Sequence, residues 1–396
     1  MNVLVFTPTP THPPIQGNRQ RVFDICRAMQ SAGAEITLLY YATEGVSPAE
    51  ARQMRDAWGD VEVVFPRGFV HRQTLARYPG IDDWFDERIL EAAGSLCRQK
   101  KFDLCVANYA WYSKIFEALP AEVIRVIDAH DIFGGRAEKF TELGLPPAWF
   151  HTSIAQESVG LDRADFVVAI QEHEAEALKN RTNSTVRVVG FLSSEQFLPV
   201  RRKVPGERLV VGYVGSGNPF NVASMLSFAE VVRRRQEVNE AVEFQVAGMV
   251  CNALTQAPHP FVLNGVMNSV RDFYRSVDVI INPMLGGTGL KIKSLEALSF
   301  GKPLIATADA MAGIASSHAS HNLRNMDELL DALLQVAADP ARLAEEETVS
   351  RRVFRDYREA QMGAFRSLWA EIESAVAERA SGLGGSESLH QQWAVP

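Results

Sequence analysis

One short stretch of the sequence carries most of its capacity for chemistry. Its loop is rich in glycine and consists of Gly286, Gly287, Thr288 and Gly289. A predicted helix follows and carries Lys291, Lys293 and Glu296. Glycines let a backbone approach a ligand closely, and the free N–H groups at the start of a helix attract anions. The stretch therefore predicts an anion site, to which the two lysines add positive charge.

Glu296 extends this site beyond an anion alone. Positions 289, 293 and 296 share one helical face, so the carboxylate can lie beside an anion and accept hydrogen bonds from vicinal hydroxyls, as on a ribose. The alternative is an ordinary surface pair of Lys293 and Glu296, worth roughly 0.2–0.5 kcal/mol. Two lysines in a first turn oppose the helix dipole at a cost of about 0.3–1 kcal/mol each unless a bound anion neutralises their charge. We therefore favour a sugar nucleotide as the ligand.

Two further loops follow predicted strands. Gly17 begins a predicted helix after the first strand, with Arg19 and Arg21 close by, which makes a second candidate anion site; a plain loop explains the same residues equally well. In the second half, Gly215 and Ser216 follow the strand predicted over 209–214. Glycine there permits close backbone approach to a ligand, and we expect Asn221 to cap the next helix.

His130 directly follows the strand predicted over 124–127, within the sequence Asp128-Ala129-His130-Asp131. A histidine next to an acid can serve as an oriented donor or acceptor at neutral pH. The competing interpretation is a histidine satisfied by local backbone. The acids of Gln171-Glu172-His173-Glu174 are predicted to be helix caps and surface charge.

The composition is that of an ordinary globular protein. Of 396 residues, 46% are hydrophobic and 22% charged, and the net charge of −8 argues against nucleic acid as a partner. The four cysteines form no Cys-x-x-Cys pair, so free thiols are expected. Neither a signal pattern nor an apolar run of ~18 residues is found. We expect a cytoplasmic protein, with peripheral contact to the inner face of the membrane as an alternative.

Short apolar runs alternate with longer amphipathic stretches throughout the chain. This pattern predicts an α/β fold of two Rossmann-like, doubly wound domains that face each other across a cleft. The predicted parts are a first domain over 1–195, a linker over 196–208, a second domain over 209–350, C-terminal helices over 351–380 that pack back toward the first domain, and a disordered tail over 381–396.

At these residues the chain resembles glycosyltransferases of the GT-B fold, in the retaining family 4 (glycosyltransferases group 1). The resemblance runs from Met1 to about residue 370 and is most specific over 286–307. It implies that Glu296 holds the ribose, that Gly287 and Gly289 turn against the diphosphate, that His130 lies near the donor sugar, and that Gly17 belongs to the first-domain loop. Thr288 stands where the family's Glu-x7-Glu motif has its first glutamate. We expect Lys291 and Lys293 to supply the positive charge that the loop 216–221 lacks.

The resemblance implies an enzyme that moves a sugar from a nucleotide-sugar donor, held by the second domain, to a glycan, lipid-linked or small-molecule acceptor, held by the first. Retention of configuration and a role in polysaccharide biosynthesis are implied in the same way. Without an Asp-x-Asp motif, neither a metal nor another cofactor is expected. The predicted catalytic residues are His130, Lys293 and Lys291. The predicted donor-binding residues are Gly17, Arg19, Gly215, Ser216, Gly286, Gly287, Thr288, Gly289 and Glu296. A sugar-nucleotide epimerase and an inactive nucleotide-sugar-binding scaffold remain as alternatives.

Overall fold

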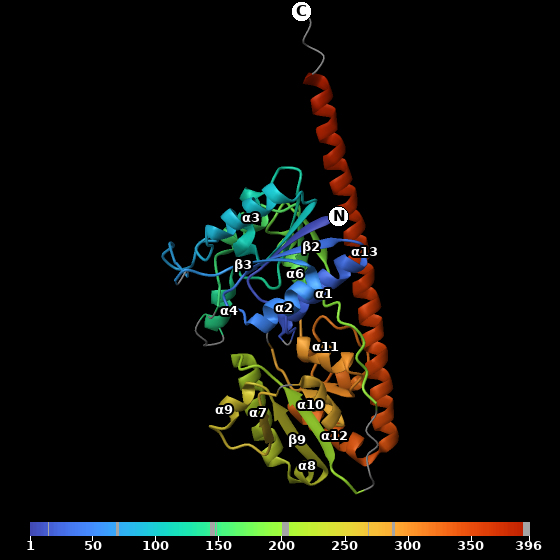
Figure 1. Cartoon of the computed structure of the whole chain (residues 1–396). Coiled ribbons are helices and arrows are strands. Elements are labelled where there is room, and N and C mark those ends of the chain that lie inside the picture. Colours follow the sequence, from blue (N-terminus) through green and yellow to red (C-terminus); the bar gives the residue numbers. More distant parts are fainter. Residues whose placement is uncertain are drawn as a thin grey trace, which may run out of the picture. The chain divides into compact units, whose positions relative to one another are not determined.

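The computed structural model describes residues 1–14, 16–68, 71–142, 147, 149–199, 206–267, 269–286 and 290–390, with side chains up to residue 381. The chain divides into two compact units (Figure 1). The first unit comprises Met1–Leu192 together with Gln361–Pro396, and the second comprises Ser193–Ala360. Within the segment predicted as the linker, 196–208, residues 200–205 lie outside the described residues.

The first unit contains a parallel seven-stranded sheet in the order β3-β2-β1-β4-β5-β6-β7. Its strands are β1 (Asn2–Thr7), β2 (Glu35–Tyr41), β3 (Asp60–Val64), β4 (Leu104–Asn108), β5 (Ile124–Asp128), β6 (Phe166–Ala169) and β7 (Thr185–Val188). Its helices before residue 192 are α1 (Gly17–Ser31), α2 (Pro48–Trp58), α3 (Arg88–Gln99), η1 (Ala110–Ala118), α4 (Arg136–Glu142), α5 (Ile154–Leu161) and α6 (Glu172–Lys179).

Strand β1 shows why these apolar runs form a sheet that is covered on both faces. Leu4 and Phe6 belong to one buried cluster, whereas Val3 and Val5 belong to another. Since successive side chains point to opposite faces, a strand that is apolar at every position is stable only when helices cover both sides. The order of chain connections reverses between β1 and β4, and the loops after those strands are where such sheets bind ligands.

The second unit contains a parallel five-stranded sheet in the order β10-β9-β8-β11-β12. Its strands are β8 (Leu209–Val214), β9 (Val242–Ala247), β10 (Val262–Gly265), β11 (Val279–Asn282) and β12 (Leu304–Ala306). Its helices are α7 (Pro219–Arg234), α8 (Gln236–Ala241), α9 (Val250–Leu254), α10 (Val270–Ser276), α11 (Ile292–Ser299), η2 (Asp309–Met311), η3 (Ala319–His321) and α12 (Met326–Ala338), followed by the first part of α13 (Pro340–His390). The α/β class with two parallel sheets flanked by helices is therefore confirmed.

Helix α13 is one long helix where the sequence predicts separate helices (Figure 1). Its residues from Gln361 onward belong to the first unit, where Phe365, Leu368, Trp369 and Ile372 join the buried cluster of Val3 and Val5. The i, i+3, i+4, i+7 spacing of these four residues places them on one helical face. The helix continues to His390, into the segment predicted to be disordered, and residues 391–396 lie outside the described part of the chain.

Candidate active site

The start of helix α11 is fixed by a buried network of small polar side chains. At the end of β11, Asn282 donates from Nδ2 to the Ser294 hydroxyl (2.9 Å), which in turn donates to the Ala310 carbonyl oxygen (2.6 Å). These bonds tie the first turn of α11 to the strand before it and to the turn after β12. Helix α11 carries Lys293, and Lys291 immediately precedes it, where the sequence predicted both lysines inside the helix. Both residues therefore have a defined position relative to the sheet edge.

The glycine loop before α11 is only partly described. Gly286 has a positive φ of 76°, which favours glycine, and its N–H donates to the Asp309 carboxylate (2.7 Å). Gly287, Thr288 and Gly289 lie outside the described residues, so the predicted diphosphate turn stays a prediction.

Lys293 connects α11 to the loop after β8. Its Nζ donates to Asn221 Oδ1 (2.5 Å), and Asn221 Nδ2 donates to both the carbonyl oxygen (3.1 Å) and the hydroxyl (2.9 Å) of Ser216. Lys293, Asn221 and Ser216 thus come together, although the prediction that Asn221 caps α7 is wrong. The cap is Asn218, whose Oδ1 accepts the Phe220 N–H (2.9 Å), because the helix begins earlier than the sequence suggested.

The electrostatics of α11 favour an anion. Burial first, and then the neighbouring charge of Lys291, lower the pKa of Lys293 to about 8 against the opposing effect of Glu296. Lys291, the residue that precedes the helix, is only 6% exposed. Two ammonium groups that share a partly buried site repel one another, and a bound anion removes this cost.

Glu296 lies on the same helix, and its carboxylate accepts a hydrogen bond from a neighbouring tyrosine. The Tyr274 hydroxyl donates to its Oε2 (3.1 Å), and the Tyr274 ring stacks on Phe300 (4.5 Å between centroids). Burial raises the pKa of Glu296, while Tyr274 and Lys293 act in the opposite direction. Two carboxylate oxygens have about four acceptor positions, so the Tyr274 bond leaves capacity for hydroxyl groups of a ligand.

Gly215 has a packing reason to be glycine. A Cβ at this position would lie 2.7 Å from the Tyr213 ring, and a Cβ at Gly248 would lie 2.3 Å from the Gly215 carbonyl oxygen. The Gly215 N–H donates to Ala247 (3.0 Å), and its carbonyl oxygen accepts from Val250 (3.1 Å). The loop after β8 is therefore packed tightly against the turn after β9.

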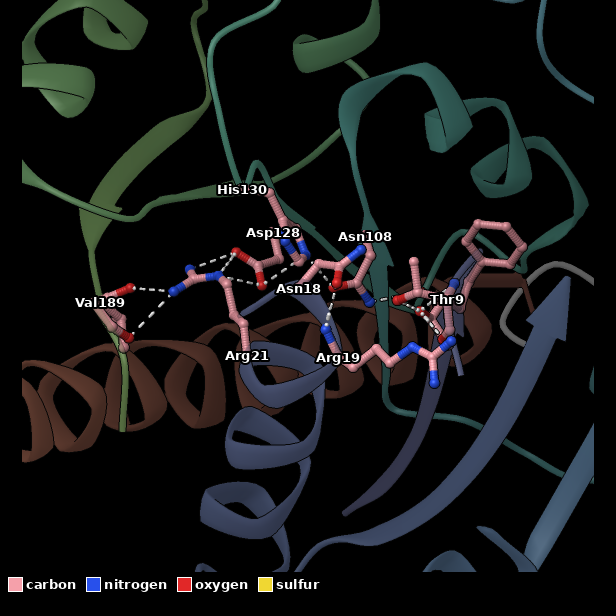
Figure 2. Close-up of polar contacts among 11 residues, drawn as sticks. Thr9, Asn18, Arg19, Arg21, Asn108, Asp128, His130 and Val189 are labelled. Carbon is pink, nitrogen blue, oxygen red and sulfur yellow. Dashed lines mark hydrogen bonds and ion pairs between the residues drawn. The ribbon is translucent and has the colours of Figure 1, made fainter. Parts of the chain in front are cut away.

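In the first unit, His130 lies at the centre of a buried polar network (Figure 2). Its Nε2 is 2.7 Å from Asn108 Oδ1 and 3.5 Å from the Asp128 carboxylate, and its ring stacks on Tyr109 (4.2 Å between centroids). The residue is 7% exposed. The pKa of His130 is lowered to about 4, mainly by burial. The Asp128 carboxylate acts to raise this pKa, and the Arg21 charge acts to lower it. The imidazole is neutral at physiological pH.

The two arginines near Gly17 have acidic partners. Gly17 is the first residue of α1, and no side chain caps this end. Arg19 donates to Glu44, and Arg21 forms a bidentate pair with Asp128 at 1% exposure (Figure 2). Both guanidinium charges are therefore offset by carboxylates. The interpretation of Arg21 as a cation close to an anion site is wrong, because its charge is used inside the domain.

Sequence reasoning overlooked Asn108 and misjudged Glu174. Asn108 ends an apolar strand and is paired in register with Asp128 on the next strand, which is a signal only once the strand order is known. Glu174 was expected at the surface but is 5% exposed, and burial together with Asp131 raises its pKa to about 8. Glu174 shares one face of α6 with the apolar residues Ala175 and Leu178, and this helical spacing could have indicated its burial from the sequence.

No group of three or more His, Cys, Asp or Glu side chains among the described residues is placed to hold a metal ion. No helix within the described ranges combines the length and apolar character needed to cross a membrane.

Comparisons with known proteins identify the family of this chain. The family described as "Glycosyl transferase 4-like domain" matches residues 16–191, and "Glycosyl transferases group 1" matches residues 208–345. Together the two matches cover most of the chain. The search of curated proteins found no match.

Several solved structures share the fold. Sucrose-phosphate synthase from Thermosynechococcus elongatus is similar at 15% identity and a TM-score of 0.66, over 94% of this chain and 99% of that chain. A glycosyltransferase from Rickettsia africae gives 11% identity and a TM-score of 0.64 over 95% and 98%. Anabaena HepE, solved with UDP and glucose, gives 12% identity and a TM-score of 0.58 over 97% and 100%. At these identities the likeness concerns the two-domain architecture.

Proposed function

The chain belongs to the glycosyl transferases of group 1, and we propose that it moves a sugar, with retention of configuration and without a metal or other cofactor, from a nucleoside diphosphate to an acceptor hydroxyl. Nucleotide-sugar-dependent transfer is the activity of this family. The observation that carries the finer proposal is the junction of Lys293, Asn221 and Ser216 beside Lys291.

The lysines support a leaving-group role. Cleavage of the bond between sugar and phosphate leaves negative charge on the departing diphosphate, and fixed cations stabilise that charge as it develops. Asn221 holds the ammonium group of Lys293 in place before the donor arrives, so little reorganisation is needed during the reaction. Arg19 contributes less than the sequence suggested, because Glu44 already neutralises it.

Glu296 and His130 have separate proposed tasks. Glu296, supported by Tyr274, receives the ribose hydroxyls and thereby reads the nucleoside part of the donor. His130, at the carboxyl end of β5, lies near the transferred sugar or the incoming hydroxyl. As a neutral imidazole it accepts or donates a hydrogen bond and carries no charge.

The acceptor is proposed to be a glycan, a lipid-linked sugar or a small molecule, bound by the first domain in the cytoplasm. A lipid-linked acceptor would bring the enzyme to the inner face of the membrane. Co-sedimentation with anionic vesicles that do or do not carry a lipid-linked sugar separates that case from a free acceptor.

The decisive experiment incubates the full chain with UDP-, GDP-, ADP- and dTDP-sugars, with UDP-glucose first because the Anabaena relative was solved with UDP and glucose. Release of nucleoside diphosphate should depend on added acceptor, persist in EDTA and give a product with the anomeric configuration of the donor. Conversion of the donor without an acceptor would indicate an epimerase instead. Binding without any turnover would indicate a scaffold.

Lys293→Met and Lys179→Met form a matched pair for that assay. The first removes the charge at the junction, and the second removes an exposed lysine at the end of α6. We expect the first alone to lose turnover. Equal activity of the two variants would remove Lys293 from the site.

A further inference from the structure

The orientation of the Asn108 amide can be read from its two partners. Its Nδ2 lies 2.7 Å from the Phe6 carbonyl oxygen, which can only accept, so the NH2 group must face Phe6. Oδ1 then faces His130 Nε2 at 2.7 Å (Figure 2). Since an amide oxygen can only accept, Nε2 must carry the proton.

Asp128 also favours a proton on Nε2, but without a partner of its own it would stabilise the doubly protonated, charged imidazolium. Its Oδ2 lies 3.5 Å from the same Nε2, so a second acceptor faces the protonated nitrogen. An unpaired carboxylate at this distance would favour the charged imidazolium. The imidazole therefore needs Asp128 to be compensated if it is to remain neutral.

Arg21 provides the compensation. Its Nε lies 2.9 and 2.8 Å from the two Asp128 oxygens, and its Nη2 lies 2.5 Å from Oδ1. The remaining nitrogen, Nη1, donates to the carbonyl oxygens of Val189 (3.0 Å) and Gly190 (3.2 Å), so the guanidinium is locked in place (Figure 2). Helix α1 and the ends of β5 and β7 are thereby joined at one ion pair.

The backbone fixes the ring from the other side. Tyr109 and His130 are non-glycine residues with positive φ values of 71° and 61°, a conformation that costs energy and persists only where its surroundings enforce it. Both follow adjacent strands, β4 and β5, and their rings stack with 25° between the planes. Rotation of the imidazole would break this stack as well as the Asn108 bond.

We infer that Arg21, Asp128 and Asn108 act together as positioning residues that hold His130 as the neutral tautomer with its proton on Nε2, so that Nδ1 is offered to the substrate as a hydrogen-bond acceptor. Among the described residues, Nδ1 has no hydrogen-bond partner. The group it receives is a hydroxyl, of the transferred sugar or of the acceptor. The substrate side of this inference rests on the proposed function, whereas the tautomer does not.

The tautomer is tested directly by long-range proton–nitrogen NMR on the full chain labelled with 15N-histidine, with His130→Gln to assign the signals. Between pH 6 and 8 we expect a pyrrole-type Nε2 and a pyridine-type Nδ1 for His130. A proton on Nδ1, or an imidazolium at pH 7, would overturn the inference. The result is independent of activity, so a protein that shows the expected tautomer but transfers no sugar would refute only the proposed function.

Asn108→Asp tests the consequence for turnover. The substitution keeps the shape but places a second negative charge at Nε2, which should raise the titration midpoint of His130 by at least about one pH unit. Turnover of the variant should then fall to about one half of its plateau at the raised midpoint, near pH 5, where the wild-type enzyme keeps about nine-tenths, because only the neutral ring offers Nδ1 as an acceptor. Asn180→Asp, which adds the same charge at the exposed end of α6, should change neither quantity.

A loss of turnover that is equal at every pH would show that Asn108 is merely structural and would overturn its role. Arg21→Met by itself leaves a buried carboxylate unpaired and can prevent folding. The double variant Arg21→Met with Asp128→Asn removes both charges and should keep His130 neutral on Nε2. A charged His130 in that double variant would contradict the compensation by Arg21.

Discussion

The pH dependence of donor binding offers the sharpest test of the lysine site. Lys293 has a pKa of about 8 in the free protein because it is buried and lies beside Lys291. If a diphosphate binds only to the charged form, the bound anion must return this pKa to its ordinary value of 10.5 or above. Binding then takes up a proton, and raising the pH weakens it.

The size of the effect follows from the pKa. The charged fraction of free Lys293 falls from about nine-tenths at pH 7 to about one-tenth at pH 9, so affinity should fall about tenfold, or about 1.4 kcal/mol. Proton uptake at pH 8 should be about one half per ligand. Phosphate groups, whose second pKa is about 6, are essentially ionised throughout this range and add little slope of their own.

Isothermal calorimetry with a nucleoside diphosphate measures both quantities, in two buffers that differ in their heat of ionisation. Lys293→Arg keeps the charge without titrating, so its affinity should be nearly flat from pH 7 to 9. Lys293→Met should be flat as well, but weaker throughout. A flat wild-type profile, or no proton uptake at pH 8, would refute the reasoning, because an ammonium group that meets the phosphates cannot stay uncoupled from them.

Four further outcomes are expected. Glu296→Ala should weaken a nucleoside diphosphate by roughly ten- to a hundredfold in calorimetry and leave pyrophosphate unchanged, since the carboxylate meets only hydroxyls; equal losses would sink the ribose assignment. His130→Ala should lower kcat by at least about tenfold with little change in donor affinity, and normal turnover in steady-state assays would make His130 structural. Glu174 has a pKa of about 8 in the folded protein against an ordinary 4.5, so the folded state loses stability as the pH rises between those values. In urea unfolding, the free energy of unfolding of Glu174→Gln should therefore exceed that of the wild type by more than about 1 kcal/mol at pH 8 but not at pH 4. The Cβ of Gly248→Ala would lie 2.3 Å from the Gly215 carbonyl oxygen, so this variant should lower the free energy of unfolding by at least about 2 kcal/mol in the same assay. Gly265→Ala, also at positive φ but without a neighbour within 4 Å, should lower it by less.

The side-chain contacts that the sequence did not predict join residues far apart along the chain. Arg21 and Asp128 are 107 positions apart in the sequence, and Lys293 and Asn221 are 72 apart. Arg21 looked like a free cation beside Gly17 because its partner comes from β5, whose position in the sheet no local pattern reveals. Glu174 was predicted to be a surface acid because glutamate side chains are usually exposed, whereas Glu174 lies on the buried face of α6.

By itself, the sequence determined the elements and the chemical character of the second-domain site. Apolar runs such as Val3–Phe6 and the helix that stops before Gly301 follow from side-chain periodicity and backbone preference, which act over a few residues. Only the tertiary structure decided which side chains meet: Lys293 with Asn221, His130 with Asn108, Arg21 with Asp128. These pairs depend on the order of strands in each sheet and on their register, and both are set by the packing of the whole domain.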